Sequence, residues 1–95
     1  MKKDKKYRCP CCGYFTLDTE PGHFDICPVC YWEDDNIQSF EQDYTGGANE
    51  ISLNEARNNY KKIGAMEEMY LDIVRPPTED EKPENNSDNF EETLK

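Results

Sequence analysis

Two short stretches decide how this chain can fold: CPCCGY at residues 9–14 and CPVCYW at residues 27–32. Each contains the pattern C-P-x-C, in which two residues separate two cysteines. That spacing lets the backbone curl so that both sulfurs point at one centre and amide N–H groups can donate to them. The two stretches therefore predict the two halves of one metal site.

The spacing also selects the metal ligands, which are Cys9, Cys12, Cys27 and Cys30. In the first stretch, Cys11 cannot join Cys12 in one turn because adjacent residues point apart, and Gly13 supplies the permissive backbone that the turn needs. Fourteen residues separate the two pairs, one fewer than the usual zinc-ribbon spacing of about 15 to 20. This pattern predicts a metal site rather than buried inert thiols.

The residues between the cysteine pairs predict a β-hairpin. Residues 14–17 and 23–26 have the composition of strands, and DTEPG at residues 18–22 has that of a turn. Such a hairpin would bring the two pairs together. The aromatic side chains near the pairs are expected to form the small core, and they are Tyr14, Phe15, Phe24, Tyr31 and Trp32.

Zinc is the preferred metal and iron is the alternative, because four thiolates in a tetrahedron suit both. The cysteine pairs resemble those of rubredoxins, but Tyr31 stands where a glycine is expected, and the hairpin is shorter than the rubredoxin insertion. Four sulfurs close the coordination and leave no position for water or substrate. We therefore predict a structural metal, whose binding energy contributes to folding.

Cys11 and His23 stay outside the predicted ligand set. We interpret Cys11 as a small packing residue, and the alternative is a reactive or metal-competing thiol. His23 could replace one cysteine as a ligand, but four cysteines already fill a tetrahedron. The acidic run at residues 33–35 is interpreted as a solvated turn, with a patch for a basic partner or a second cation site as alternatives.

Two amphipathic helices are predicted after the second cysteine pair. SLNE at residues 52–55 has the spacing of a capping box, and apolar residues recur at helical intervals until Gly64, where a helix would end. A second helix is predicted over residues 66–74, before two prolines. Both apolar faces are expected to pack on the ribbon, although the methionine-bearing one could instead receive a partner.

The predicted fold is a small α+β domain: a zinc-ribbon-like β-hairpin with two cysteine turns, then two short helices. Of the 95 residues, we assign 1–8 to a flexible basic arm, 9–77 to the metal-stabilised domain and 78–95 to a disordered acidic tail. The tail has too little apolar material to offset the entropy of ordering. Within the domain, the cysteine turns and hairpin occupy residues 9–32 and the helices occupy about 52–74. A hydrophobic core of this size is too small to stabilise the fold alone and needs an additional stabilising element such as a bound metal.

The composition also bears on compartment and partners. No apolar stretch follows the basic start, so we expect no membrane segment. Five cysteines arranged around two C-x-x-C pairs fit metal binding by reduced thiols better than disulfides, so we expect a cytoplasmic protein. The formal net charge is -10, with positive charge gathered in residues 1–8, which disfavours nucleic acid as a partner. An acidic domain attracts basic protein surfaces, although solubility alone also explains the charge.

No catalytic constellation is present in the sequence, which has one histidine and no nucleophile motif. The paired glycines at residues 46–47 lack a phosphate-binding motif around them. We therefore expect neither an enzyme nor a small-molecule substrate.

Four segments together resemble a known family: CPCCGYFTLD (9–18), ICPVCYWEDD (26–35), GGANEISLNEARNNYKKIGA (46–65) and VRPP (74–77). They are similar to the bacterial cysteine-rich CPCC family over about residues 8–77. The resemblance implies a metal-binding fold that is zinc-ribbon-like or rubredoxin-like. It implies the ligand positions already derived and no catalytic residues.

The leading functional hypothesis is a structural zinc domain that acts as a protein-interaction module, through its acidic and aromatic surface or its helices. One alternative is an immunity-type inhibitor of a basic bacterial toxin, which small size and negative charge suggest. Another is a rubredoxin-like iron electron carrier, which its acidity would steer to a basic redox partner. A nucleic-acid-binding ribbon that uses the basic arm ranks last.

Overall fold

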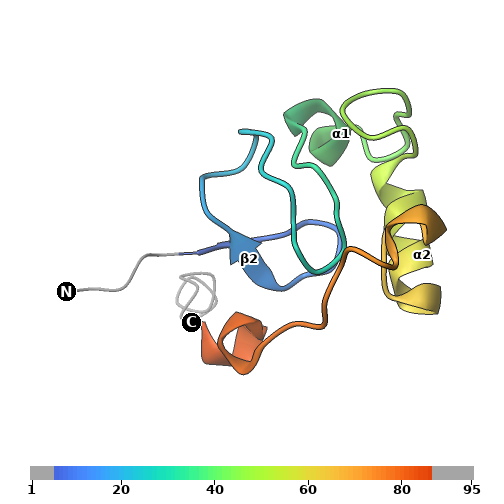
Figure 1. The fold of residues 1–95 in the computed structure, drawn as a ribbon. Helices are drawn as coiled ribbons and strands as arrows, with labels where there is room; N and C mark the ends of the chain where they lie inside the picture. Colours follow the sequence, from blue (N-terminus) through green and yellow to red (C-terminus); the bar gives the residue numbers. More distant parts are fainter. Residues whose placement is uncertain (1–5, 87–95) are drawn as a thin grey trace.

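Two β-strands, two α-helices and three 3₁₀ turns follow one another along residues 6–86, the part of the chain that this computed structural model describes (Figure 1). The strands are β1 (Tyr7–Arg8) and β2 (Phe15–Leu17), the α-helices are α1 (Asn36–Phe40) and α2 (Leu53–Ile63), and the 3₁₀ turns are η1 (Glu68–Tyr70), η2 (Glu79–Glu81) and η3 (Pro83–Asn85). The predicted class, a small α+β domain with a two-stranded antiparallel hairpin and a cysteine cluster, is confirmed.

The hairpin encloses the first cysteine pair rather than joining the two pairs. β1 pairs with β2 in antiparallel register, with Arg8 opposite Phe15, and around the second pair Ile26 forms an isolated antiparallel bridge with Glu33. The predicted pairing of residues 14–17 with 23–26 is therefore wrong. Each C-P-x-C turn reverses the chain by itself, so the residues on either side of one turn become strand neighbours.

Between β2 and the second cysteine turn the chain forms a loop, and the Asp25 carboxylate holds its start. Asp25 accepts hydrogen bonds from the backbone N–H groups of Asp18 and Thr19, at 2.9 and 2.8 Å, and from the Thr19 hydroxyl at 2.8 Å. These bonds satisfy backbone donors that a hairpin would have paired. They also lower the pKa of the Asp25 carboxyl, with the Thr19 hydroxyl as the largest cause.

Helix α2 forms as the sequence predicts. Ser52 caps it by accepting a hydrogen bond from the backbone N–H of Glu55 at 3.1 Å, and the helix ends at Gly64 in the left-handed conformation. Leu53 and Ala56 are fully buried, so this side of α2 packs into the core. The predicted start and end of the helix are confirmed.

The second predicted helix, residues 66–74, is wrong, because only the single turn η1 forms there. The backbone N–H of Met66 donates to the carbonyl of Cys30 at 2.9 Å, which fixes the start of this segment on the second cysteine turn. After Met66 three apolar side chains of the segment are exposed, Met69 by 64%, Leu71 by 42% and Ile73 by 58%. Without a surface to bury them, the apolar pattern gains nothing from helix formation.

Helix α1 begins directly after the acidic run at residues 33–35, which the sequence analysis interpreted as a solvated turn. Asp35 caps it, with its carboxylate accepting from the backbone N–H groups of Ile37 and Gln38. Asp34 is buried and accepts from the backbone N–H of Gly22 at 3.0 Å. These two carboxylates therefore satisfy backbone donors rather than forming a solvated patch.

Gln38 on α1 is the centre of a buried polar core. Its amide nitrogen donates to the carbonyls of Tyr44, Asn49 and Ile51, at 3.0 to 3.1 Å. Its amide oxygen accepts from the backbone N–H and the side-chain amide of Asn49. Asn49 in turn bonds both the N–H and the carbonyl of Glu33. This network ties the loop before α2 to the second cysteine turn.

The apolar core forms around the cysteine sulfurs. Its fully buried members outside the cysteines come from β2, the second cysteine turn, α2 and the segment after α2, and they include Leu17, Val29, Trp32, Leu53 and Met66. Partly buried tyrosines complete it, with Tyr31 stacked on Tyr70 at 4.4 Å between ring centroids and Tyr14 edge-on to Tyr60 at 6.5 Å. The cluster and the core are thus one unit.

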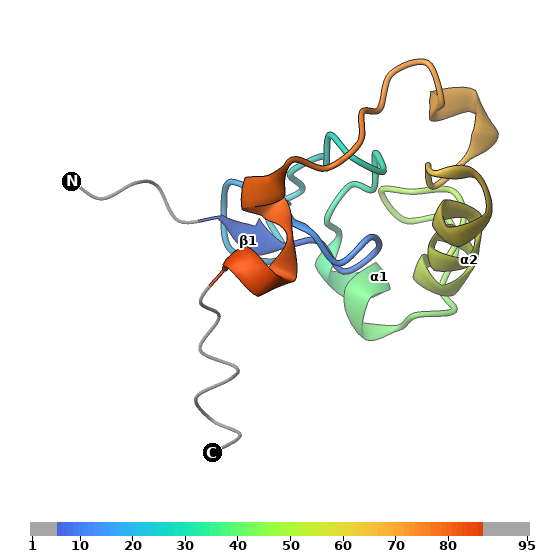
Figure 2. The ribbon, with the colours of Figure 1, turned by 90° about the horizontal axis from the view of Figure 1, so that it is seen from below.

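After η1 the chain returns across the molecule, and η2 lies against β2 at the opposite end from α2 (Figures 1 and 2). The structure folds residues 78–86 into two turns, whereas the sequence predicted disorder from residue 78. The bidentate ion pair between Arg75 and Glu81 holds the first of these turns. The predicted acidic tail beyond residue 86 and the predicted arm up to residue 5 lie outside the described residues.

At the other end, β1 takes up two residues that were assigned to the basic arm. None of the helices in residues 6–86 has the length and apolar character that crossing a membrane requires.

Candidate metal centre

The four predicted ligands come together at one point. The sulfurs of Cys9, Cys12, Cys27 and Cys30 all lie within 4.8 Å of one another. The Sγ atoms of Cys9 and Cys30 are 3.6 Å apart, and those of Cys12 and Cys27 are 3.7 Å apart. A tetrahedron with metal–sulfur bonds of about 2.3 Å has sulfurs about 3.8 Å apart, so the four cysteines could hold a metal ion.

Both cysteine turns have the same backbone hydrogen bonds, and each residue has its counterpart 18 positions later. The N–H of Cys9 donates to the carbonyl of Tyr14, as that of Cys27 does to Trp32, both at 2.9 Å. The carbonyl of Cys9 accepts from the N–H of Gly13, as that of Cys27 does from Tyr31. The centre is therefore built from two copies of one local structure.

Gly13 and Tyr31 are counterparts in this repeat, and both have left-handed backbone, with φ of 85° and 76°. Glycine adopts such a φ without cost, whereas tyrosine does so only under strain. The stacking of Tyr31 on Tyr70 helps to hold the strained turn. Tyr31 therefore occupies the place of the expected glycine without changing the path of the chain.

Hydrogen bonds from outside the ligand set orient two of the sulfurs. Cys9 Sγ accepts from the backbone N–H of Cys11 at 3.4 Å, and Cys27 Sγ accepts from that of Val29 at 3.3 Å. The Thr16 hydroxyl lies 3.0 Å from Cys27 Sγ. Such donors fix the direction of a thiolate and stabilise its charge. Sequence reasoning missed Thr16, and its position in β2 carries no signal that marks it.

The close approach of the four cysteine sulfurs shifts the pKa of each thiol. Hydrogen bonds from Cys12 and the other cysteines lower the pKa of Cys27, so one sulfur holds the negative charge readily. Hydrogen bonds among the sulfurs raise the pKa of Cys9, Cys12 and Cys30, and burial adds to this effect. Four thiolates this close need a cation between them, which is the chemistry of a metal site.

Cys11 is buried and lies outside the four-sulfur cluster. It is the counterpart of Val29, which is also buried, and both residues donate a backbone N–H to the first sulfur of their turn. This placement agrees with its interpretation as a packing residue. The Cys11 side chain is nevertheless the largest of the causes that raise the pKa of Cys30.

His23 is exposed and is not part of the cluster. Its Nδ1 lies 2.9 Å from the carbonyl oxygen of Glu20, within the loop between the two cysteine turns. The alternative in which it replaces a cysteine ligand therefore has no support in the geometry.

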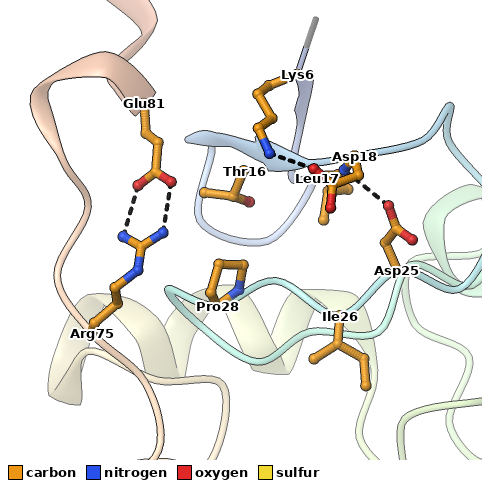
Figure 3. Close-up of a pocket in the computed structure, with 9 residues that line it drawn as sticks. All are labelled: Lys6, Thr16, Leu17, Asp18, Asp25, Ile26, Pro28, Arg75 and Glu81. Carbon is orange, nitrogen blue, oxygen red and sulfur yellow. Dashed lines mark hydrogen bonds and ion pairs between the residues drawn. The ribbon is translucent and has the colours of Figure 1, made fainter. Parts of the chain in front are cut away.

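A polar hollow of about 310 Å³ lies beside the second cysteine turn (Figure 3). Thr16 and Pro28 line it, and two ion pairs flank it: Lys6 with Asp18, and Arg75 with Glu81. Arg75 also donates its backbone N–H to the carbonyl of Pro28 at 3.2 Å. The C-terminal segment is thereby fastened to the turn that carries two of the ligands.

Residues 7–81 match the protein family described as Cysteine-rich CPCC. The match includes both cysteine turns, α2 and the segment up to Glu81, so it extends beyond the predicted limit of the resemblance at residue 77. A search of curated proteins finds none that matches this chain. With its four ligands gathered and more than three quarters of its residues matched, this chain belongs to the cysteine-rich CPCC family.

Proposed function

We propose that this chain is a structural zinc domain that serves as a protein-interaction module. One observation supports the structural role: four cysteine sulfurs lie within 4.8 Å of one another, and three of these cysteines are fully buried members of the apolar core that residues 6–86 form. A site with four protein sulfurs has no open position for a reacting water. The metal then supplies the stability that the small core lacks.

The interaction role is supported by the segment from Ile63 to Ile73. Apolar side chains stay exposed along it, with Ile63 and Leu71 each 42% accessible in addition to Met69 and Ile73. Acidic residues alternate with them at positions 67, 68 and 72. Exposed apolar groups among charges are typical of surfaces that another protein covers.

The charge of this segment favours a basic partner. Burial raises the pKa of Glu67, and the nearby carboxylates of Glu50 and Glu55 raise it further. A Lys or Arg side chain placed among these three carboxylates would relieve their repulsion. An inhibitor of a basic toxin would be one member of this class of interaction protein.

The test uses partner capture with matched variants. The zinc-loaded chain is exposed to cell extract at low salt, and captured proteins are compared with those of Met69→Ser/Ile73→Ser and of Ile37→Ser/Phe40→Ser. The second variant removes two exposed apolar side chains from α1. We expect a defined basic protein to be lost with the first variant and with added salt, and to be retained with the second. Identical captured sets for all three chains would contradict the interaction role.

An iron electron carrier is the second candidate, and the hydrogen bonds to the sulfurs favour it. Donors on Cys9 and Cys27 together with the partial exposure of Cys12 are features that tune the potential of a thiolate-bound iron. Metal analysis of protein made in cells supplied with zinc and iron separates the two. One zinc per chain supports the structural role, and one iron with visible absorbance replaces it by electron transfer.

A further inference from the structure

An open hollow of about 400 Å³ lies beside the first cysteine turn. It is lined by residues 9–13 of that turn together with Arg8 and Arg57, and no carboxylate contributes to its lining. Arg8 and Arg57 are two of the three arginines of a chain whose formal net charge is -10. Positive charge is thus concentrated at one place next to the metal centre.

The backbone of the turn holds both guanidinium groups in place. Nε of Arg8 donates to the carbonyl of Gly13 at 3.0 Å, and Nε of Arg57 donates to that of Pro10 at 2.9 Å. The Arg8 guanidinium also lies 5.7 Å from the centre of the Phe15 ring, and Nη1 of Arg57 donates to Gln42 at 3.0 Å. Nε anchors both side chains and Nη1 of Arg57 bonds Gln42, so both Nη groups of Arg8 and Nη2 of Arg57 remain for a ligand.

The hollow in Figure 3 shows the contrasting case. There each cation has its own carboxylate, Lys6 with Asp18 and Arg75 with Glu81. Within residues 6–86 no carboxylate forms an ion pair with Arg8 or Arg57. The cations at the hollow of Figure 3 are therefore already neutralised by carboxylates, whereas Arg8 and Arg57 beside the first cysteine turn are not.

Cys12 is the one cysteine of the four-sulfur cluster that is not fully buried, and it lines this hollow. A zinc ion with four thiolates carries a net charge of about -2. The two guanidinium groups offset that charge on the open side. An anion can then approach the first turn without net repulsion from the centre.

We propose that this hollow binds a small dicarboxylate, with one carboxylate on the guanidinium of Arg8 and the other on that of Arg57. Guanidinium groups recognise carboxylates through paired N–H donors, and two anchored groups select a ligand with two charges. The site is independent of the surface at residues 63–73 and of the partner proposed for it.

The experiment follows the Nε–Hε signals of the three arginines by NMR in the zinc-loaded full chain, with succinate as the probe at constant ionic strength. The signals of Arg8 and Arg57 should shift and saturate at millimolar succinate. Arg75, which is paired with Glu81, should not shift and serves as the internal control. Equal shifts at all three arginines, shifts that never saturate, or shifts that accompany zinc loss would overturn the proposal.

Variants and a second probe sharpen the result. Arg8→Gln and Arg57→Gln should each weaken succinate binding at least tenfold, and Lys61→Gln/Lys62→Gln on α2 should not. Arg8→Lys and Arg57→Lys keep the positive charge but lose the paired N–H donors of the guanidinium group. They should weaken succinate binding at least threefold with the fold intact. Acetate, with one carboxylate, should bind at least tenfold more weakly, and an affinity equal to that of succinate would exclude the two-arginine site.

Discussion

The five cysteines of this chain are chemically alike, yet their positions assign them two roles. Four sulfurs lie within 4.8 Å of one another, where they could hold one metal ion, and the fifth cysteine occupies the place that a valine has in the second turn. What separates Cys11 from the ligands is the backbone geometry of the turn rather than any property of the residue. This difference can be tested by single substitutions.

Replacing any one of Cys9, Cys12, Cys27 and Cys30 by Ser should abolish stoichiometric zinc binding and the folded state. Structural zinc contributes about 10 to 16 kcal/mol, more than a small domain can lose. Cys11→Val, which copies the second turn, should retain one zinc per chain. Elemental analysis and circular dichroism of each variant provide the measurement. Zinc loss in the valine variant would show that Cys11 is a ligand.

Gly13→Ala should destabilise the zinc-loaded protein by about 1 to 2 kcal/mol, the cost of left-handed backbone for a residue with a Cβ. An added Cβ would meet only Nη2 of Arg8, at 3.9 Å, so steric overlap does not contribute. Chelator-free urea unfolding measures the change. Gly13→Asn serves as the control, since asparagine tolerates this conformation better. Unchanged stability of the alanine variant would mean that the turn can relax.

At the scale of elements, the sequence predicts those whose signal is local. The C-P-x-C turns are predicted by their cysteine spacing, and α2 is predicted by its Ser52 cap and by Gly64 at its end. Strand pairing was wrong because the strands flank the turns, and their short length leaves no alternation to read. The second helix was wrong because periodicity does not reveal whether a surface exists to bury it. α1 was missed because acidic residues give no sign of being buried.

Gln38→Ala should lower the free energy of unfolding by about 2 to 4 kcal/mol. The change removes the Gln38 donor from the carbonyls of Tyr44, Asn49 and Ile51 and the Gln38 acceptor from the buried backbone N–H of Asn49, and each buried group left without a partner costs about 1 to 3 kcal/mol. Asn58→Ala on the exposed side of α2 is the matched control and should have little effect. Urea unfolding of zinc-loaded protein compares them. If the two variants are equally stable, the polar network does not hold the loop.

Removal of residues 78–95 should speed zinc transfer to a chelator several-fold, whereas removal of residues 87–95 should not. The longer deletion takes away Glu81, whose carboxylate holds the Arg75 side chain beside the second turn. Stopped-flow absorbance with a coloured chelator measures the rate. Equal rates of zinc transfer for the two truncations would show that residues 78–86 do not stabilise the metal site.

The same contact has a defined pH dependence. Arg75 lowers the pKa of Glu81, so the pairing is present above the ordinary pKa of a glutamate, about 4.3, and is lost as the pH falls through the lowered pKa. At neutral pH the ion pair is therefore fully formed. Glu81→Gln should mimic its loss without acid, and should increase the rate of zinc transfer as the longer truncation does.

For the whole molecule, the metal centre and the apolar core are one structure, and removing the metal should unfold both. Trp32 is the single tryptophan and is fully buried among the cysteines, so it reports on this core. A chelator should shift its fluorescence to longer wavelength, in parallel with loss of circular dichroism, and added zinc should restore both. An unshifted spectrum at complete zinc removal would show that the core is stable alone.

The sequence predicted the four-cysteine cluster better than it predicted the rest of the molecule. Ligand identity depends on residue type and spacing, which are visible in the chain itself. Arg57 meets Pro10 across 47 residues, and Thr16 meets Cys27 through strand packing, so neither contact has a local signature. Contacts of that kind arise only when the elements have come together.

The repetition of one turn 18 residues apart has a kinetic consequence. Each turn sets two sulfurs by hydrogen bonds within six residues, so either turn can capture an ion before the rest of the chain has found its place. The other turn is connected to it by a short loop, so its two sulfurs are present at high effective concentration near the bound ion. Assembly can therefore start from either end of the centre, and zinc would act as the nucleus around which the later contacts collect.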